Sequence, residues 1–345
     1  MNKKVRDSNI ELLRCLLMLL IVIQHFVAHN ILSKDDPVDY GGKNFISANM
    51  LLAFCVSAVN CFVLISGYYG IKFSLKKLFL FLLPIFFYEL VMSFIWYPCK
   101  HHVSITAFNY WFVRSFVALM IISPILNKGL ECLNRRQIQV ILLLLIAIFI
   151  VPLSSFSGNA GKNILIFVLL YLTGYYLRHF YKNKLSGGGY FVGYVLCSLL
   201  IFAEAFMFAR LGYGYEVQII AFNYDNVLVY AASIFLFLSF REYNIKSSFV
   251  NWIAASSFFV YIISENENMY SRPFSFYELI GVDNWNQSHY YPLLVIISSL
   301  LLFVACILID KIRSMLFRGI EAKIGTLISK LDGKITNNIS SHECV

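Results

Sequence analysis

The sequence predicts an all-α protein that crosses a membrane with about ten helices and keeps both termini in the cytoplasm. Three observations support this prediction. Hydrophobic residues make up 59% of the 345 residues and charged residues only 14%, whereas about a quarter of a soluble domain is charged. The apolar residues come in blocks of about 18–24, the length of a membrane-spanning helix. Lysine and arginine gather in alternate loops between these blocks, as the positive-inside rule describes.

The apolar blocks define the expected helices in order along the chain. They lie at roughly 10–31, 46–68, 76–97, 107–127, 138–155, 161–180, 190–210, 217–240, 248–265 and 290–315. The first block follows Lys3, Lys4 and Arg6, and no small-residue cleavage pattern comes after it. We therefore interpret it as a retained helix and not as a signal peptide.

The loops between the helices fall into two sets that differ in charge. One set holds most of the 28 lysines and arginines, among them Lys72, Lys76, Lys77, Lys128, Arg135, Arg136, Arg178, Lys182, Lys184, Arg241 and Lys246. The other set holds Lys34, Lys43, Lys100, Lys162, Arg210 and Arg272. This asymmetry predicts that the first set faces the cytoplasm. It also explains the net charge of +9 without a nucleic-acid partner.

The chain is expected to form one membrane domain, residues 1–315, followed by a cytoplasmic amphipathic tail, residues 316–345. Two long loops, 32–45 and 266–289, would then face outward. They are candidates to bind an acceptor, or they are plain solvated connectors. The eight cysteines are scattered without a C-x-x-C pair, so neither a disulfide framework nor a metal site is predicted.

The first predicted helix carries a stripe of polar side chains within its apolar segment. Arg14 and His25 are eleven residues apart, which at about 100° per residue brings them within about 20° of the same direction. At about 1.5 Å per residue they lie roughly 16 Å apart along that face. Glu11 and His29 extend the stripe by one turn at either end. Because such groups are costly in hydrocarbon, the stripe predicts a functional site that faces the protein interior or a wet cavity. The alternative is that Glu11 and Arg14 are interfacial anchors and His25 is a hydrogen-bonded core residue.

Other polar residues in the predicted helices are weaker candidates. They are Asn60 and Ser66 in the second helix, Glu89 in the third, Trp111 and Arg114 in the fourth, Glu204 in the seventh, and Tyr261, Ser264 and Glu265 at the end of the ninth. A belt of interfacial aromatic residues is enough to explain Trp111. Arg114 and Glu89 are harder to explain, because a charge in hydrocarbon needs a partner.

Several motifs resemble one known family. The first helix reads Glu11-Leu-Leu-Arg14, then ten residues, then His25-Phe, and this spacing resembles the Arg-x10-His signature of the acyltransferase-3 family of integral membrane O-acyltransferases. Later segments agree, namely Asn60 to Ser66-Gly67-Tyr68, Lys72 to Lys76-Lys77 before Pro84, Tyr110-Trp111-Phe112 before Pro124, and Leu172-Thr-Gly174-Tyr175. The likeness covers about residues 8–312.

Two segments depart from the family pattern. The basic loop carries lysines where many members have Arg-x-x-Arg. The ninth helix ends Tyr261-Ile-Ile-Ser264-Glu265, where members often have Tyr-Leu-x-His. Neither departure affects Arg14 or His25, so they put the details of donor binding in question more than the reaction class.

The resemblance implies an acyl-CoA donor from the cytoplasm, usually acetyl-CoA, which is a substrate and not a bound cofactor. It also implies a carbohydrate acceptor, such as a cell-surface polysaccharide or its precursor, and a multi-pass protein of a bacterial cell membrane. His25 would act as general base or acyl carrier, and Arg14 would bind the donor. Weaker substrate-binding candidates are Glu11, Asn60, Ser66, Trp111, Arg114, Lys72, Lys76 and Lys77, with the lysines facing the phosphates of CoA.

Two competing interpretations come from other classes of protein. One is a transporter or polymerase of glycans or lipid-linked sugars, and the other is an inactive membrane scaffold. Proteins of the first kind also have ten or more helices with buried arginine, but they do not need the Arg-x10-His stripe. Binding of acetyl-CoA would separate the acyltransferase from both.

Overall fold

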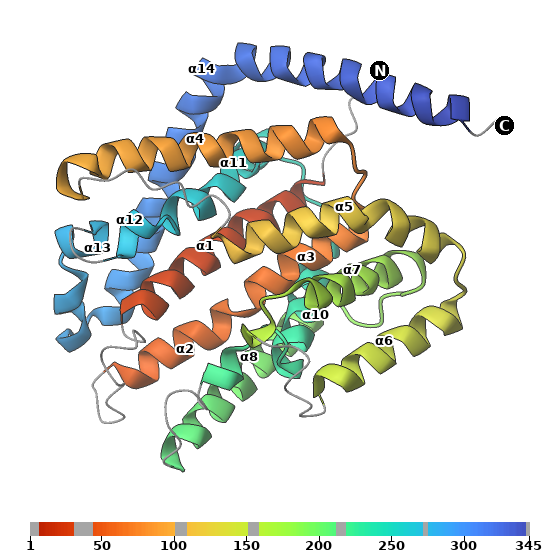
Figure 1. Cartoon of the computed structure of the whole chain (residues 1–345). Coiled ribbons are helices and arrows are strands. Elements are labelled where there is room, and N and C mark those ends of the chain that lie inside the picture. The colour runs from red at the N-terminus through yellow and green to blue at the C-terminus, as the bar shows by residue number, and fades with distance from the viewer. Residues whose placement is uncertain are drawn as a thin grey trace.

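The computed structural model describes residues 7–30, 44–100, 109–150, 159–211, 219–271 and 275–342. It is 85% helical, and the described residues contain no strand, which confirms the predicted all-α class. Figure 1 shows the helices packed into a single bundle, with the last one turning across one end. Most of the predicted outward loop 32–45 lies outside the described residues.

The long helices follow the apolar blocks of the sequence. They are α1 (Ser8–Asn30), α2 (Phe45–Cys55), α3 (Ser57–Tyr69), α4 (Leu75–Lys100), α5 (Trp111–Glu131), α6 (Arg135–Ile150), α7 (Ile164–His179), α8 (Gly187–Arg210), α10 (Val227–Arg241), α11 (Ser248–Ser264) and α14 (Tyr291–His342). Shorter helical turns join them, namely η1 (Asn159–Gly161), η2 (Ile219–Phe222), α12 (Glu267–Tyr270), α13 (Phe276–Leu279) and η3 (Val282–Gln287).

Among the described residues, seven segments are long and apolar enough to cross a bilayer, and α2 and α3 together form one of them. The helices α7 and α11 are apolar but shorter. The structure is therefore that of a polytopic membrane protein. The count of ten spans and the cytoplasmic position of the termini stay predictions.

The first helix lies inside the bundle, in contact with α2, α3, α10, α11 and α14. Its side chains Leu13, Leu17, Val22 and Phe26 are completely buried. Because lipid tails are as apolar as these side chains, close van der Waals packing against the neighbouring helices holds α1 in place, and removal from water does not. The polar stripe on α1 is thereby held among neighbouring helices.

Two glycines let α3 and α7 approach backbone to backbone. A Cβ added to Gly67 would lie 2.3 Å from the carbonyl oxygen of Tyr171, and one added to Gly174 would lie 2.4 Å from that of Leu64. Both distances are impossible for real atoms, so larger residues would push the helices apart. On α7, Phe167 also packs against Trp111 of α5, with ring centroids 6.0 Å apart.

The start of α1 meets the ends of α3 and α10 at one end of the bundle. The side-chain amide of Asn9 donates to the carbonyl of Phe240 at 3.0 Å, and the Tyr69 hydroxyl donates to Asp7 Oδ2 at 2.7 Å. Lys72 follows α3 at this end. We call it the basic end, and we call the end where α1 finishes the opposite end.

The last helix is continuous from the bundle into the predicted tail and crosses the basic end (Figure 1). Where it bends, Arg313 Nε donates to Asp310 Oδ1 at 2.8 Å, and Arg313 Nη1 donates to Glu321 Oε1 at 2.5 Å. The Tyr88 hydroxyl of α4 donates to Asp310 Oδ1 at 2.8 Å. Arg313 and Asp310 are buried, and their pairing satisfies charges that would otherwise be costly there.

Candidate active site

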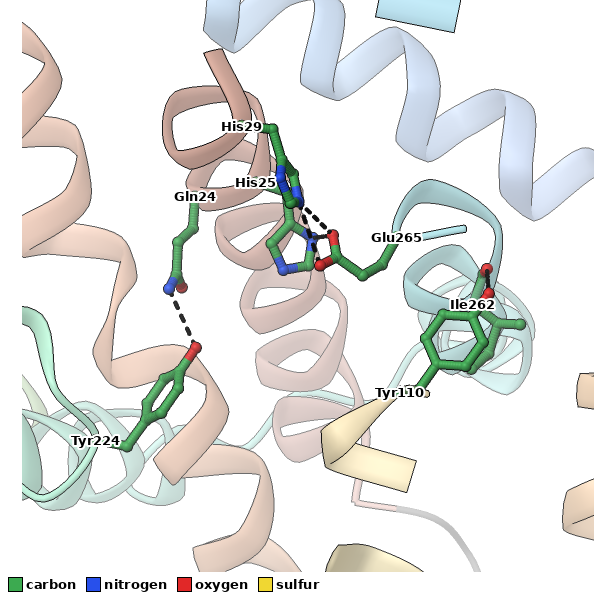
Figure 2. Close-up of polar contacts among 7 residues, drawn as sticks. All are labelled: Gln24, His25, His29, Tyr110, Tyr224, Ile262 and Glu265. Carbon is green, nitrogen blue, oxygen red and sulfur yellow. Dashed lines mark hydrogen bonds and ion pairs between the residues drawn. The ribbon is translucent and has the colours of Figure 1, made fainter. Parts of the chain in front are cut away.

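Two histidines on α1 and a glutamate just after α11 meet at the opposite end of the bundle (Figure 2). His25 Nδ1 lies 2.9 Å from Glu265 Oε2. His29 Nε2 lies 3.1 Å from the same oxygen and 3.3 Å from Oε1. The exposed fractions of the side chains are 13% for His25, 23% for His29 and 20% for Glu265. One carboxylate thus holds two imidazoles that are one helical turn apart.

The charge of Glu265 and the tautomer of His25 are coupled. The two imidazoles lie 2.9 Å and 3.1 Å from the Glu265 carboxylate, and a positive charge on either ring would favour its ionised form. Nδ1 of His25 faces the carboxylate as an ion pair that is not aligned as a hydrogen bond. A small rotation of the imidazole would align it, and a carboxylate on this side favours the tautomer that leaves Nε2 to accept a proton. Within the described residues, no group of His, Cys, Asp and Glu is arranged to hold a metal ion.

A buried hydrogen-bond network holds the chain where it leaves Glu265. The amide of Asn266 donates to Glu89 Oε1 at 2.8 Å, and the hydroxyl of Tyr110 donates to the same oxygen at 2.5 Å. Figure 2 shows Tyr110 also reaching the carbonyl of Ile262, at 3.0 Å. The side chain of Glu89 is completely buried. The network ties α4, α5 and α11 together, so Glu265 stands on a rigid turn.

Two cavities adjoin the pair of His25 and Glu265. A narrow apolar one of about 20 Å³ is lined by His25 together with Met18, Ile21, Val59, Phe62 and Phe258. A larger polar one of about 280 Å³ is lined by Glu265 together with Asn109, Glu267, Tyr270 and Ser271. Trp111 and Tyr261 line both cavities. These two rings therefore form a partition, and the contact between His25 and Glu265 links one side to the other.

Tyr224 lines the apolar cavity, and hydrogen bonds from residues outside the cavity hold it in place. The amide of Gln24, next to His25, donates to the Tyr224 hydroxyl at 3.2 Å (Figure 2). The amide of Asn60 donates to the Tyr224 carbonyl at 2.8 Å. The rings of Tyr224 and Trp111 pack with centroids 5.0 Å apart. Asn60 therefore supports the wall, and it is not among the residues that line either cavity.

The other predicted donor-binding residues lie at the basic end. Arg14 Nη1 is 3.6 Å from Glu11 Oε1, and the Arg14 side chain is 36% exposed. Lys72, Lys76 and Lys77 are exposed, and Lys77 Nζ donates to the carbonyl of Lys72 at 2.7 Å. The structure thus separates the predicted residues into two groups, one at each end of α1.

Two further predicted residues lie apart from both cavities. The hydroxyl of Ser66 donates to the carbonyl of Phe62, one turn earlier in α3, at 3.2 Å. Arg114 is exposed on the first turn of α5, whereas Trp111 on the same turn lines both cavities. The sequence places Arg114 and Trp111 near the membrane surface, at the start of the fourth predicted helix. It does not show which face of that helix each of them occupies.

Several residues of the site had no assigned role in the sequence interpretation. The sequence marks Glu265 and Tyr261 as polar residues at the end of the ninth helix, in a segment that departs from the family pattern, but it does not assign them a role. A carboxylate that follows an apolar helix, on the same predicted side of the membrane as His25, was a usable signal for Glu265. Tyr224 follows the short helix η2, and Asn266 precedes the short helix α12. Nothing in the sequence around either residue indicates a role in the site.

Comparison with known protein families gives one match, and it covers most of the chain. The family model described as an acyltransferase domain matches residues 7–311. This range contains both cavities, the contact between His25 and Glu265, and Arg14 with the three lysines. The chain matches no curated protein and no solved structure.

Proposed function

The chain belongs to the acyltransferase-3 family and is a multi-pass membrane acyltransferase, and from this premise we propose that it O-acetylates a carbohydrate. It would transfer an acetyl group from acetyl-CoA to a hydroxyl of a cell-surface or extracellular polysaccharide, or of its precursor, at the plasma membrane of a bacterium. The single observation that carries the proposal is the contact between His25 and Glu265 at the boundary of two chemically different cavities.

The basic end provides the chemistry that an acyl-CoA donor needs. CoA is a polyanion, and guanidinium and ammonium groups bind phosphates through charge-assisted hydrogen bonds. Arg14, Lys72, Lys76 and Lys77 supply such groups on the side that the positive-inside rule assigns to the cytoplasm. The roughly 16 Å from Arg14 to His25 along α1 is comparable to an extended pantetheine arm. The apolar cavity beside His25 matches the acetyl thioester in polarity, but at about 20 Å³ it holds little more than a water molecule and must widen to admit the thioester.

The polar cavity provides the chemistry that a sugar acceptor needs. Its rings, Trp111, Tyr261 and Tyr270, offer flat apolar faces, and Glu265 and Glu267 offer hydrogen-bond acceptors. Ligand sites of this kind combine aromatic walls with a few polar groups that fix orientation. Its volume of about 280 Å³ favours one sugar unit of a longer acceptor over several units at once.

The proposed reaction is direct acyl transfer with His25 as general base. Nε2 of His25 takes the proton of an acceptor hydroxyl as its oxygen bonds to the thioester carbon. Glu265 holds the imidazole in the required tautomer and stabilises the imidazolium that forms. The carbon–sulfur bond then breaks, and the imidazolium returns the proton to the thiolate of CoA. The alternative is that His25 briefly carries the acyl group, and label bound to the protein in the absence of acceptor would reveal this.

Labelled acetyl-CoA and purified protein in lipid nanodiscs test the proposal directly. The acceptor is glycan from a strain that lacks this protein, because its acceptor hydroxyls are still free. We expect His25→Ala to lower the rate of transfer by about 10²–10⁴-fold, the usual contribution of a general base. The matched control is His179→Ala, which removes an exposed histidine at the end of α7 and should leave the rate unchanged.

Two results would contradict the proposal. A properly inserted His25→Ala protein with wild-type activity would show that His25 is not the base. Wild-type protein that neither binds acetyl-CoA nor labels the glycan would reject the acetyltransferase itself, and a transporter or a scaffold is expected to give that result.

A further inference from the structure

The partition between the two cavities contains a tyrosine with an unusual environment. Tyr261 is 6% exposed and lines both the apolar and the polar cavity. Its ring centroid is 6.0 Å from that of His25. Tyr261 therefore lies beside the imidazole of His25, where an acyl donor in the apolar cavity and an acyl acceptor in the polar cavity would meet.

The hydroxyl of Tyr261 differs from those of the neighbouring tyrosines. The Tyr110 hydroxyl donates to Glu89, and the Tyr224 hydroxyl accepts from Gln24. The Tyr261 hydroxyl is buried, and the backbone N–H of Phe112 faces its oxygen. An N–H group can only donate, so the proton of this hydroxyl has no acceptor among the described residues. A buried hydroxyl proton without an acceptor is costly, by about 1–3 kcal/mol, and such groups in native structures call for an explanation such as a catalytic role.

The ring of Tyr261 is held by its neighbours, so the hydroxyl has a fixed position. The centroid distances are 5.7 Å to Tyr110, 5.9 Å to Phe112 and 6.2 Å to Phe258. Tilted and edge-on aromatic contacts of this kind fix the ring plane. A donor that is already in place when charge develops is more effective than one that must reorient.

We propose that the Tyr261 hydroxyl is the hydrogen-bond donor that stabilises the oxyanion during acyl transfer, and this inference rests on the proposed function. When the acceptor oxygen bonds to the thioester carbon and its proton passes to His25, the carbonyl oxygen becomes negative and accepts a hydrogen bond from Tyr261. When the carbon–sulfur bond breaks, the carbonyl re-forms and the proton on His25 goes to the thiolate. Tyr261 keeps its own proton throughout.

Tyr261 fits this role better than the residues predicted for it from the sequence. The side-chain amide of Asn60 already donates to the Tyr224 carbonyl. Arg114 is exposed and is not among the residues that line either cavity. Trp111 lines both cavities, and its ring packs on Tyr224, so it is assigned to shaping the partition.

Replacing the hydroxyl while keeping the ring tests the inference. We expect Tyr261→Phe to lower kcat by about 10²–10³-fold, the usual cost of one oxyanion donor. The KM for acetyl-CoA should change little, and the pH profile of kcat should keep its shape because His25 remains. The control is Tyr291→Phe, which removes another buried hydroxyl whose proton has no acceptor among the described residues, away from both cavities. It should have wild-type kcat.

The outcomes separate this inference from the proposed function. An active wild type with Tyr261→Phe within about twofold of its kcat overturns the oxyanion role alone, since an oxyanion donor contributes far more than that. An equal loss in Tyr261→Phe and Tyr291→Phe also overturns it, because the effect would then come from loss of packing. A wild type that transfers no acetyl group overturns the proposed function and this inference with it. Elution volume in detergent and thermal midpoint establish that each variant is folded.

Discussion

The two ends of the polar stripe on α1 are held in different ways. At the opposite end, His25 and His29 contact a carboxylate that follows another helix, and the His25 side chain is 13% exposed. At the basic end, Arg14 contacts Glu11 three residues earlier on its own helix, and its side chain is 36% exposed. One end is therefore tied to another part of the chain, whereas the ion pair of Arg14 among the described residues is made within α1.

This difference matches what each end is proposed to do. Acyl transfer requires a base held within a fraction of an ångström of the reacting atoms, because misplacement of about 1 Å can lower a rate about 10²-fold. Binding the phosphates of a large donor requires charge and reach more than a single geometry. A rigid end and an adaptable end on one helix would let a mobile polyanion enter and still present its thioester to a fixed imidazole.

The largest effect is expected from a substitution at the opposite end, where Glu265 faces His25. Glu265→Gln keeps the size of the side chain but removes the charge that orients His25, so we expect kcat to fall by about 10²–10⁴-fold. The control is Glu267→Gln, which removes a second carboxylate from the same cavity without touching His25. Equal activities for the two variants in the acetyl-transfer assay would mean that Glu265 only adds negative charge to the cavity.

The next largest effect is expected at Glu89, and it tests whether the network of Glu89, Tyr110 and Asn266 holds the turn that carries Glu265. Glu89 is completely buried and bonded to Tyr110 and Asn266, so Glu89→Gln should destabilise the fold by about 1.5–3 kcal/mol, the range for a hydrogen bond to a charged group. The thermal midpoint in detergent measures this. Glu131→Gln, at an exposed position near the end of α5, should leave the midpoint unchanged. A stable Glu89→Gln protein would show that packing alone holds Glu265.

A smaller effect is expected at the adaptable end. Arg14→Ala should raise the KM for acetyl-CoA about tenfold, because one charge-assisted hydrogen bond contributes about 1.5–3 kcal/mol, and it should change kcat little. The KM of Arg14→Lys should lie between those of the wild type and Arg14→Ala, since lysine keeps the charge but lacks the planar guanidinium. Arg136→Ala, exposed near the start of α6, is the control. A loss of kcat at unchanged KM would show that Arg14 acts in the chemical step, and the two ends of α1 would then not differ in function as proposed.

The smallest effects are expected at the three lysines. Each of Lys72→Gln, Lys76→Gln and Lys77→Gln should raise the KM for acetyl-CoA only about twofold, because exposed charges contribute up to about 1 kcal/mol each. The effects should disappear when KM is measured at high salt, where the screening length falls to about 3 Å at 1 M. Effects that persist at high salt would mean that the lysines hold the donor in a fixed, buried geometry.

Much of the fold could be predicted because its signals are local. The ninth predicted helix, 248–265, is α11, Ser248–Ser264, and the last apolar block became the first half of α14. Hydrophobic length and helical spacing were enough for both. The alignment of Arg14 and His25 on α1 also follows from spacing along one helix.

The site could be predicted only in part, because its contacts are not local. Glu265 is far from His25 in the sequence, and only the packing of α11 against α1 brings them together. Arg114 and Trp111 illustrate the same point within one helical turn. Their spacing predicts that they differ in direction, but which of them faces the interior depends on how α5 meets its neighbours.

The sequence by itself determined the class of this protein, the extent of its helices, and which polar residues share one face of α1. Each of these depends on properties of contiguous segments, namely apolar length, helical period and the charge of the flanking loops. Only the tertiary structure decided which groups complete the site, namely Glu265 beside His25 and Tyr261 between the cavities. Packing makes that decision because it sets which face of each helix meets its neighbours and which is left on the outside of the bundle, and the polar groups that then meet come from residues far apart in the chain.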